Sequence, residues 1–277
     1  MAADVTSSPL ASPALLTPLE LYRRAEQQQW SAFDMDLRDD VRQWEALAEE
    51  LRRALAKLLV PFYLGEQRVA MRFTALIDAA ADENEASYLA TQLVDEARHM
   101  HFFDRYLTAI SAVDGGDLAT RIESAGSQVN DAFKQLFDAE LDAAANALAD
   151  DPSVEHRVDF VATYHMVIEG MLALAGQEAL TVDLRDRKIL PVFAAGVDLV
   201  ARDEHRHLAY GAWALDRDAR GVASLEERLR ERFARLVPLA VQILGAPHQV
   251  DIARQALRRR MGAIGLTHVL PTSILER

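Results

Sequence analysis

Cysteine is absent from this sequence of 277 residues. Disulfide bonds, thiolate ligands and a cysteine nucleophile are therefore excluded, so any bound metal ion must be held by oxygen and nitrogen atoms. Glycine and proline are scarce, at 12 and 9 residues, while alanine, leucine, glutamate and arginine are common. Because the common residues favour helix and the scarce ones interrupt it, the composition predicts a mainly helical protein.

Basic residues and long apolar runs are also lacking. The chain carries 30 Lys and Arg against 43 Asp and Glu, a formal charge of −13, without the clustered basic segment that nucleic-acid-binding proteins present. No stretch approaches the ~20 apolar residues that cross a bilayer as a helix, and the first twenty residues do not have the pattern of a secretory signal. We therefore expect no nucleic-acid partner, no membrane span and a cytoplasmic location.

Apolar residues recur at three- and four-residue spacing in eight segments, which predict eight helices. They are residues 36–59, 61–80, 83–113, 117–149, 153–181, 185–218, 222–245 and 248–263. Pro61 is expected in the first turn of the second helix, where its missing N–H costs little. The separators are too short to be domain linkers. We predict a mobile tail over residues 1–20, one helical domain over 21–265 and an irregular tail over 266–277.

The string Asp-Glu-x-x-His occurs twice, at residues 95–99 and 203–207. Residues three apart lie on one face of a helix, so each string directs one carboxylate and one imidazole to a common point. A single such string is most simply a coincidence on a charged face. Both strings, however, lie on otherwise apolar faces, where an unpaired carboxylate is costly and a cation stabilises it.

Two further acids lie on apolar faces, Glu66 and Glu169. The chain order is thus Glu, Glu-x-x-His, Glu, Glu-x-x-His, which is the ligand set of dinuclear carboxylate proteins built on a ferritin-like four-helix bundle. We predict that bundle, with additional flanking helices, as the fold. Four carboxylates and two imidazoles suit two ions such as iron or manganese. The predicted ligands are Glu66, Glu96, His99, Glu169, Glu204 and His207.

Asp95 and Asp203 each precede a ligand glutamate, and we predict that they accept hydrogen bonds from ligand histidines. An exposed surface acid is the alternative for Asp95. His165 lies four residues before Glu169 and projects from the same side of the helix. It is a candidate seventh ligand or proton relay close to the metals, and a core histidine with its own hydrogen bonds is the alternative.

These strings give the chain a resemblance to the ribonucleotide reductase small subunits, and within that fold to the ligand-binding oxidases that lack reductase activity. The resemblance covers roughly residues 60–215 and is carried by residues 65–69, 95–103, 164–170 and 202–211. It implies a manganese/iron cofactor, with a di-iron cofactor as the alternative, oxygen as the oxidant, a long-chain fatty acid bound at the metals, and a homodimer. It leaves the substrate and the electron donor open.

The ligand-binding oxidases also form an ether cross-link between a valine three residues after the first ligand glutamate and a tyrosine five residues before the third. Val69 and Tyr164 occupy these positions. In a regular helix, Val69 lies about 60° round from Glu66, but Tyr164 lies about 140° from Glu169. Tyr164 therefore needs a local distortion such as a π-bulge to point inward.

The chain departs from these relatives at three positions. Phe103 stands where a radical-storing small subunit has tyrosine, which speaks against an ordinary tyrosyl-radical subunit. Gln67 stands where the relatives tend to have a second acid, and Gln177 where they tend to have tyrosine eight residues after the third ligand. The polar surroundings of the site are therefore expected to differ.

The function that we expect is an oxygen-dependent dinuclear metal oxidase or oxygenase that takes a lipid-like ligand. The alternatives are a radical-generating subunit of a ribonucleotide reductase, a di-iron oxygenase of another substrate class, and a metal-storage or ligand-carrier protein. Storage calls for shorter four-helix chains than this one. An arylamine N-oxygenase would have an additional histidine where Val200 stands.

Overall fold

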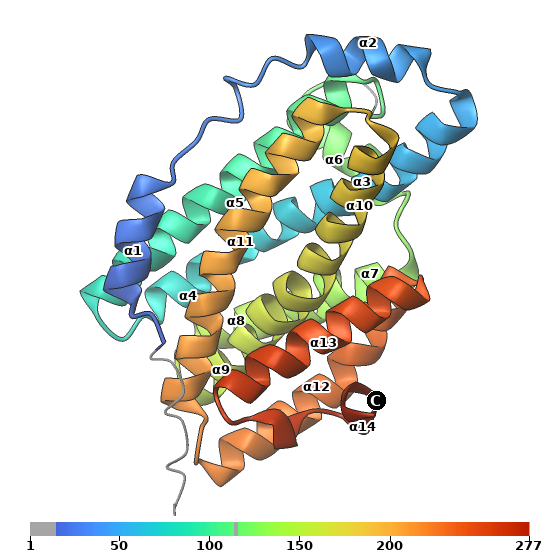
Figure 1. Ribbon diagram of the computed structural model, residues 1–277. Coiled ribbons are helices and arrows are strands. Elements are labelled where there is room, and N and C mark those ends of the chain that lie inside the picture. Colours follow the sequence, from blue (N-terminus) through green and yellow to red (C-terminus); the bar gives the residue numbers. More distant parts are fainter. Residues whose placement is uncertain (1–14, 114–115, 277) are drawn as a thin grey trace, which may run out of the picture.

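The computed structural model describes residues 15–113 and 116–276, and in these ranges it contains helices and no strand (Figure 1). In chain order the elements are α1 (Pro18–Gln27), α2 (Arg38–Ala46), α3 (Glu49–Arg72), α4 (Thr74–Asp78), α5 (Glu83–Ala109), α6 (Leu118–Gly126), α7 (Asp131–Lys134), the π-helix η1 (Gln135–Leu141), α8 (Asp142–Asp150), α9 (Val154–Val161), the π-helix η2 (Ala162–Ala173), α10 (Leu174–Arg187), α11 (Pro191–Asp218), α12 (Ala223–Leu244), α13 (Pro247–Ala263), the 3-10 turn η3 (Thr267–Val269) and α14 (Thr272–Leu275). The predicted all-α fold class is confirmed.

Four long helical stretches form the central bundle, namely α3, α5, the continuous stretch α9–η2–α10, and α11. Helix α3 packs along α5, and α11 packs against α5, η2 and α10. Additional helices surround them, with α1 along α5, and α12 and α13 on η2, as can be followed in Figure 1. Each of the four stretches carries one of the predicted ligand strings or lone acids, so the bundle brings them toward one axis.

The predicted helix boundary at Pro61 is wrong. We expected helices at residues 36–59 and 61–80, whereas the breaks lie after α2 and after α3, and Pro61 is inside α3. An interior proline removes one backbone hydrogen bond and usually bends a helix. Leu59 and Leu64, on either side of Pro61, are fully buried. Packing of both halves against the bundle keeps the helix continuous.

Other helix boundaries also differ from the prediction. The segment predicted as one helix at residues 117–149 is divided into α6, α7, η1 and α8, and the side chain of Asn130 starts α7 by accepting a hydrogen bond from the backbone N–H of Phe133. The helix predicted to end at residue 181 continues to Arg187.

The two chain ends also differ in detail from the expectation. Helix α1 begins at Pro18, within the segment predicted as a tail, and residues 1–14 lie outside the described residues. At the other end, η3 and α14 fall in the segment predicted to be irregular, and Val269 and Ile274 are buried there. The division into one domain with two tails stays a prediction.

The π-helix η2 is the most buried element of the bundle. All residues from Ala162 to Leu172 are buried. Helix α11 approaches η2 closely at Gly211, where an added Cβ would lie 2.5 Å from Cβ of His165 and 2.7 Å from Cε of Met166. The absence of a side chain at Gly211 therefore sets the spacing between these two helices.

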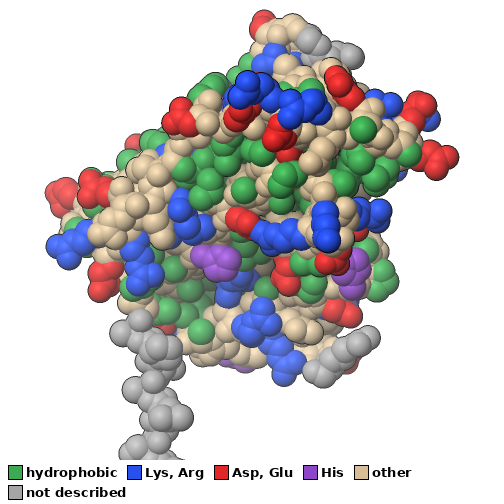
Figure 2. All heavy atoms as spheres, turned by 45° about the horizontal axis from the view of Figure 1, so that its top comes forward, with side chains coloured by type: hydrophobic (Ala, Val, Ile, Leu, Met, Phe, Trp, Pro, Cys, Tyr) green, Lys and Arg blue, Asp and Glu red, His purple; other side chains and the backbone are tan. Residues whose placement is uncertain are grey.

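One helical stretch among the described residues, Val154–Arg187, is long and apolar enough to cross a membrane by length and composition, but 83% of its most apolar window is buried inside the protein. Its apolar surface is therefore used in the bundle. On the face drawn in Figure 2, acidic and basic side chains are interspersed and do not gather into a basic stripe.

Candidate metal centre

The six predicted ligand side chains meet in the middle of the bundle. Two groups of ligand atoms, each lying within 4.8 Å of one another, are formed by side chains that are all buried. The first group is Glu66, Glu96, His99 and Glu204, and the second is Glu96, Glu169 and His207. The structure therefore brings together the whole predicted set, with Glu96 common to both groups.

The atom positions divide the cluster into two halves. His99 Nδ1 lies 3.4 Å from Glu66 Oε2, and His207 Nδ1 lies 3.1 Å from Glu169 Oε1. Glu96 lies between the halves, with Oε1 3.1 Å from His207 Nδ1 and Oε2 3.9 Å from His99 Nδ1. Glu204 has the same arrangement, with one oxygen 3.6 Å from each histidine. Two carboxylates between the halves and one in each half suit a pair of neighbouring cations.

Several buried atoms of the cluster have no hydrogen-bond partner among the described residues. They are both carboxylate oxygens of Glu96, Oε2 of Glu169, Oε2 of Glu204 and Nδ1 of His99. Burial raises the pKa of Glu66 to about 8, and burial together with Glu204 raises the pKa of Glu169 well above its usual value. Such unsatisfied acids are unfavourable in a protein interior unless cations bind them, so the donor set fits two metal ions.

Asp95 and Asp203 lie behind the histidines, and each contacts the histidine of the other Asp-Glu-x-x-His string. Asp203 Oδ2 is 3.3 Å from His99 Nε2, and Asp95 Oδ2 is 3.3 Å from His207 Nε2. Burial opposes ionisation of both acids, but their contacts with the histidines outweigh it and lower the pKa of each. Arg206 bridges the pair, at 2.7 Å from Asp95 and 2.8 Å from Asp203. These contacts hold each histidine with Nδ1 toward the cluster.

Trp30 also contacts Asp203 and His99, which the sequence did not indicate. Its Nε1–H donates to Asp203 Oδ2 at 2.7 Å, and its ring stacks on His99 at a centroid distance of 6.3 Å. Trp30 follows α1, 173 residues from its partner along the chain. No local pattern marks such a contact, and only its polar N–H distinguishes it from a packing tryptophan.

His165 is fully buried but belongs to neither group of candidate ligands. Its Nε2 lies 3.2 Å from Nε2 of Gln92, which also donates to Glu169 Oε1 at 3.2 Å. Burial, followed by the nearby His207, holds the pKa of His165 well below its usual value. His165 thus contacts the cluster indirectly, through Gln92, which was not among the predicted site residues.

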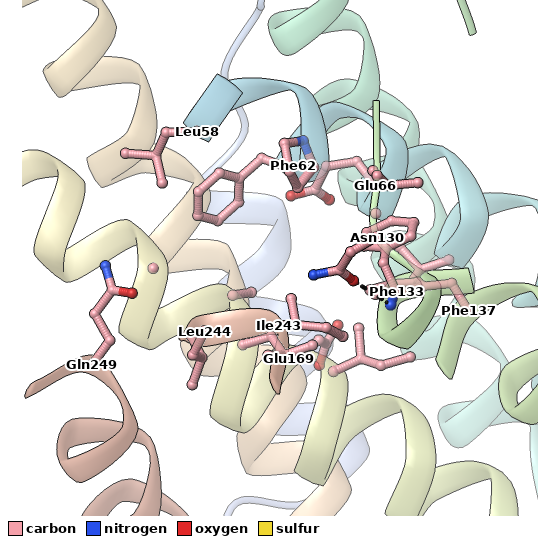
Figure 3. A pocket seen from close by; sticks show the side chains of 18 of the residues that line it. Leu58, Phe62, Glu66, Asn130, Phe133, Phe137, Glu169, Ile243, Leu244 and Gln249 are labelled. Carbon is pink, nitrogen blue, oxygen red and sulfur yellow. Dashed lines mark hydrogen bonds between the residues drawn. The ribbon is translucent and has the colours of Figure 1, made fainter. Parts of the chain in front are cut away.

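A cavity of about 380 Å³ opens onto the cluster from one side (Figure 3). Glu66, Glu96, Glu169 and Glu204 line its inner end. Most of the remaining wall is apolar and comes from α3, α7, η1, η2 and α12. It includes Phe62, Val69, Phe133, Phe137, Ile168, Leu172, Ile243 and Leu244. The space therefore suits an apolar chain whose polar end reaches the carboxylates.

Comparison with known proteins agrees with this arrangement. The sequence profile of the family described as ribonucleotide reductase, small chain, matches residues 17–244. The chain belongs to this family. The structure is similar to that of an R2-like ligand-binding oxidase from Sulfolobus acidocaldarius, with a TM-score of 0.77, 25% sequence identity, and coverage of 91% of this chain and 90% of that chain.

A second similar structure is a variant of an R2-like ligand-binding oxidase with an anaerobically reconstituted Mn/Fe cofactor. It has a TM-score of 0.78 and 22% identity, with coverage of 92% of this chain and 93% of that chain. The predicted resemblance to the ribonucleotide reductase small chains, and within them to the ligand-binding oxidases, is confirmed.

In this small-chain protein, the two residues predicted to form a cross-link are both buried beside the cluster. Val69 lines the cavity together with Glu66. Tyr164 lies in η2, the π-helical distortion that an inward tyrosine at this position requires. Burial, and then the carboxylates of Glu96 and Glu169, raise the pKa of the Tyr164 phenol well above its usual value. Tyr164 therefore stays protonated beside the cluster.

Proposed function

We propose that the protein is an oxygen-dependent dinuclear metal oxidase of the ligand-binding type. The observation that carries this proposal is the buried cluster of four carboxylates and two imidazoles with unsatisfied oxygens, at the inner end of an apolar cavity. Glu66, Glu96, His99, Glu169, Glu204 and His207 would hold the two ions. When bound, the ions would provide the site at which dioxygen is reduced.

Manganese and iron are the proposed pair, with two irons as the alternative. All ligand atoms are oxygen or nitrogen, which suits both metals. An R2-like ligand-binding oxidase of the same fold carries a Mn/Fe cofactor. Asp95 and Asp203 would keep the histidines oriented toward the ions, and the buried bundle would limit the access of water to the cluster.

The proposed ligand is a long-chain fatty acid. Phe62, Ile168, Leu172 and Leu244 give the cavity an apolar wall on several sides, as Figure 3 shows in part. A carboxylate at the inner end would be repelled by the four acids alone, so its binding there depends on the cations. The acyl chain would lie along the apolar wall and exclude water from the oxidised centre.

We further propose that oxidation joins Val69 and Tyr164 by an ether bond. A C–H bond of Val69 and the O–H bond of Tyr164 would be replaced by one C–O bond, with loss of two protons and two electrons. Dioxygen is the electron acceptor. Phe103 at the radical-storing position favours this reaction over that of a tyrosyl-radical subunit.

The test is to produce the protein in medium containing manganese and iron, under aerobic and anaerobic conditions, and to measure metal content, intact mass, a peptide map and extracted lipids. We expect two metals per chain, a long-chain fatty acid, and a loss of two hydrogens after exposure to oxygen, located in the peptides of Val69 and Tyr164. Absence of bound metal would contradict the central proposal.

Two tyrosine variants make the cross-link test specific. Tyr164→Phe should keep both metals and lose the oxygen-dependent mass change. Tyr106→Phe is the control, because it removes another buried phenol, which donates a hydrogen bond to Asp40 and not to the cluster. This variant should keep the two metals and the oxygen-dependent mass change. Two metals without the mass change in the unmodified protein would refute the cross-link and leave a radical subunit or another di-iron oxygenase as the function.

A further inference from the structure

A second cavity, of about 300 Å³, lies between α10, α11 and α13. It is on the opposite side of the continuous helix η2–α10 from the cavity at the metal centre. Leu172, Ala173 and Gly176 face the first cavity, whereas Ala175, Gln177 and Thr181 face the second. The second cavity differs in chemistry too, because Thr181, His205, Arg259 and Arg260 give it a more polar wall.

Gln177 is the main unsatisfied group of this second cavity. Its side chain is 1% exposed, and neither its amide nitrogen nor its amide oxygen has a hydrogen-bond partner among the described residues. Leaving such a buried group unpaired destabilises the folded protein. Gln177 is also one of the positions at which the sequence departs from its relatives, so a tyrosine's apolar ring is replaced by an amide that needs a partner.

Two arginines of α13 give this cavity a positive side. Arg260 is half-buried, and its Nη1 donates to the backbone oxygen of Gly170 at 2.9 Å. Burial, and then repulsion from Arg259, lower the pKa of Arg260 to about 10. An anion between the two guanidinium groups would relieve both effects, since it replaces lost hydration and screens the repulsion.

The acids on the rim do not cancel this charge. Asp198 is exposed and forms an ion pair with Arg185. The negative charge that remains at the rim is that of Glu178, which is also exposed, compared with the two positive charges of Arg259 and Arg260. His205 adds no negative charge, and its Nδ1 is directed to the backbone oxygen of Ala201. Since Asp198 is neutralised outside the cavity, the two arginines of the lining outnumber the one remaining acid, in a chain whose formal charge is −13.

We propose that this second cavity is a binding site for a small oxyanion, a carboxylate or a phosphate. Arg259 and Arg260 supply the charge, and the amide N–H groups of Gln177 donate hydrogen bonds at the inner end. The amide oxygen accepts from a hydroxyl of the ligand or from a water bound with it. Because Arg260 also contacts Gly170, next to Glu169, the bound anion would lie directly behind the helix that carries a metal ligand.

The test is calorimetric titration of the full-length, metal-loaded protein with inorganic phosphate and, separately, with acetate, against chloride at equal ionic strength. The titrations are repeated with Gln177→Leu, Arg259→Gln and Gln249→Leu. Gln249→Leu is the matched control, because it is the same substitution in a residue that lines the first cavity. Arg259 is exposed, so its replacement is not expected to disturb folding.

We expect saturable binding of phosphate or acetate, about tenfold weaker in both Gln177→Leu and Arg259→Gln and unchanged in Gln249→Leu. The anion that binds more tightly shows whether the site prefers a phosphate or a carboxylate. Binding that survives Gln177→Leu unchanged would show that the anion binds elsewhere in the protein and would overturn the proposal. The absence of binding by either anion would also overturn it and would leave water as the partner of Gln177, whether or not the protein is an oxidase.

Discussion

Asp95 and Asp203 show how single residues connect the two halves of the metal centre. Each accepts from the histidine that follows the other aspartate in the duplicated string, and Arg206 contacts both. The two strings are therefore not independent ligand pairs. A change in one aspartate alters the orientation of a histidine that belongs to the other helix.

Asp203→Asn tests this connection. We expect about 10–100-fold weaker metal binding, because an amide in place of the carboxylate holds His99 less firmly and lowers its basicity. Metal affinity measured by competition with a chelator checks the prediction. Asp198→Asn is the control, since Asp198 lies on the same helix but pairs at the surface with Arg185. An equal loss in the two variants would mean that the effect is unspecific.

The residues of the site could be predicted from the sequence to different extents. Glu96, His99, Glu204 and His207 follow from a spacing that fixes one helix face, and the structure brings them together with the two lone acids. Trp30 and Gln92 could not be predicted, because each acts through a contact between elements that are distant in the sequence. A local pattern reports the direction of a side chain but not its partner.

At the scale of elements, the π-helix η2 is the feature on which the proposed cross-link depends. The sequence indicated only that Tyr164 needs a distortion, since a regular helix turns it away from Glu169. Whether such a distortion forms is decided by packing, because α11, α12 and α13 all contact η2. The misplaced boundary at Pro61 has the same cause: buried neighbours on both sides outweigh a local helix-breaking preference.

Gly211→Ala tests the packing of α11 on η2. The added methyl group would overlap His165 and Met166, so we expect a loss of about 1–3 kcal/mol in the free energy of unfolding. Denaturant unfolding of the metal-loaded protein measures it. Gly126→Ala is the matched control, because an added Cβ there meets nothing within 4 Å and alanine favours helix. A loss as large in Gly126→Ala would contradict the explanation by close packing.

For the molecule as a whole, the buried acids of the candidate metal centre lower the stability of the fold when no cation is bound. The chain carries a formal charge of −13, and four of its carboxylates are gathered in one buried place. Three of the four have oxygens without a hydrogen-bond partner among the described residues, which weakens the bundle from inside. All four core stretches contribute proposed ligands, so bound cations would join them. The homodimer and the cytoplasmic location are properties at this scale that stay predictions.

Removal of the metals should therefore destabilise the whole bundle and not only the site. If each ion is present at about 100–1,000 times its dissociation constant, the loss of each one lowers the free energy of unfolding by roughly 3–4 kcal/mol. Thermal unfolding before and after chelation measures this as a drop in Tm. In Glu96→Ala, which lacks the carboxylate shared by both groups, chelation should change Tm far less. A Tm that is insensitive to chelation in the unmodified protein would show that the cluster does not hold ions in the folded state, and the buried carboxylates would then need another source of stabilisation.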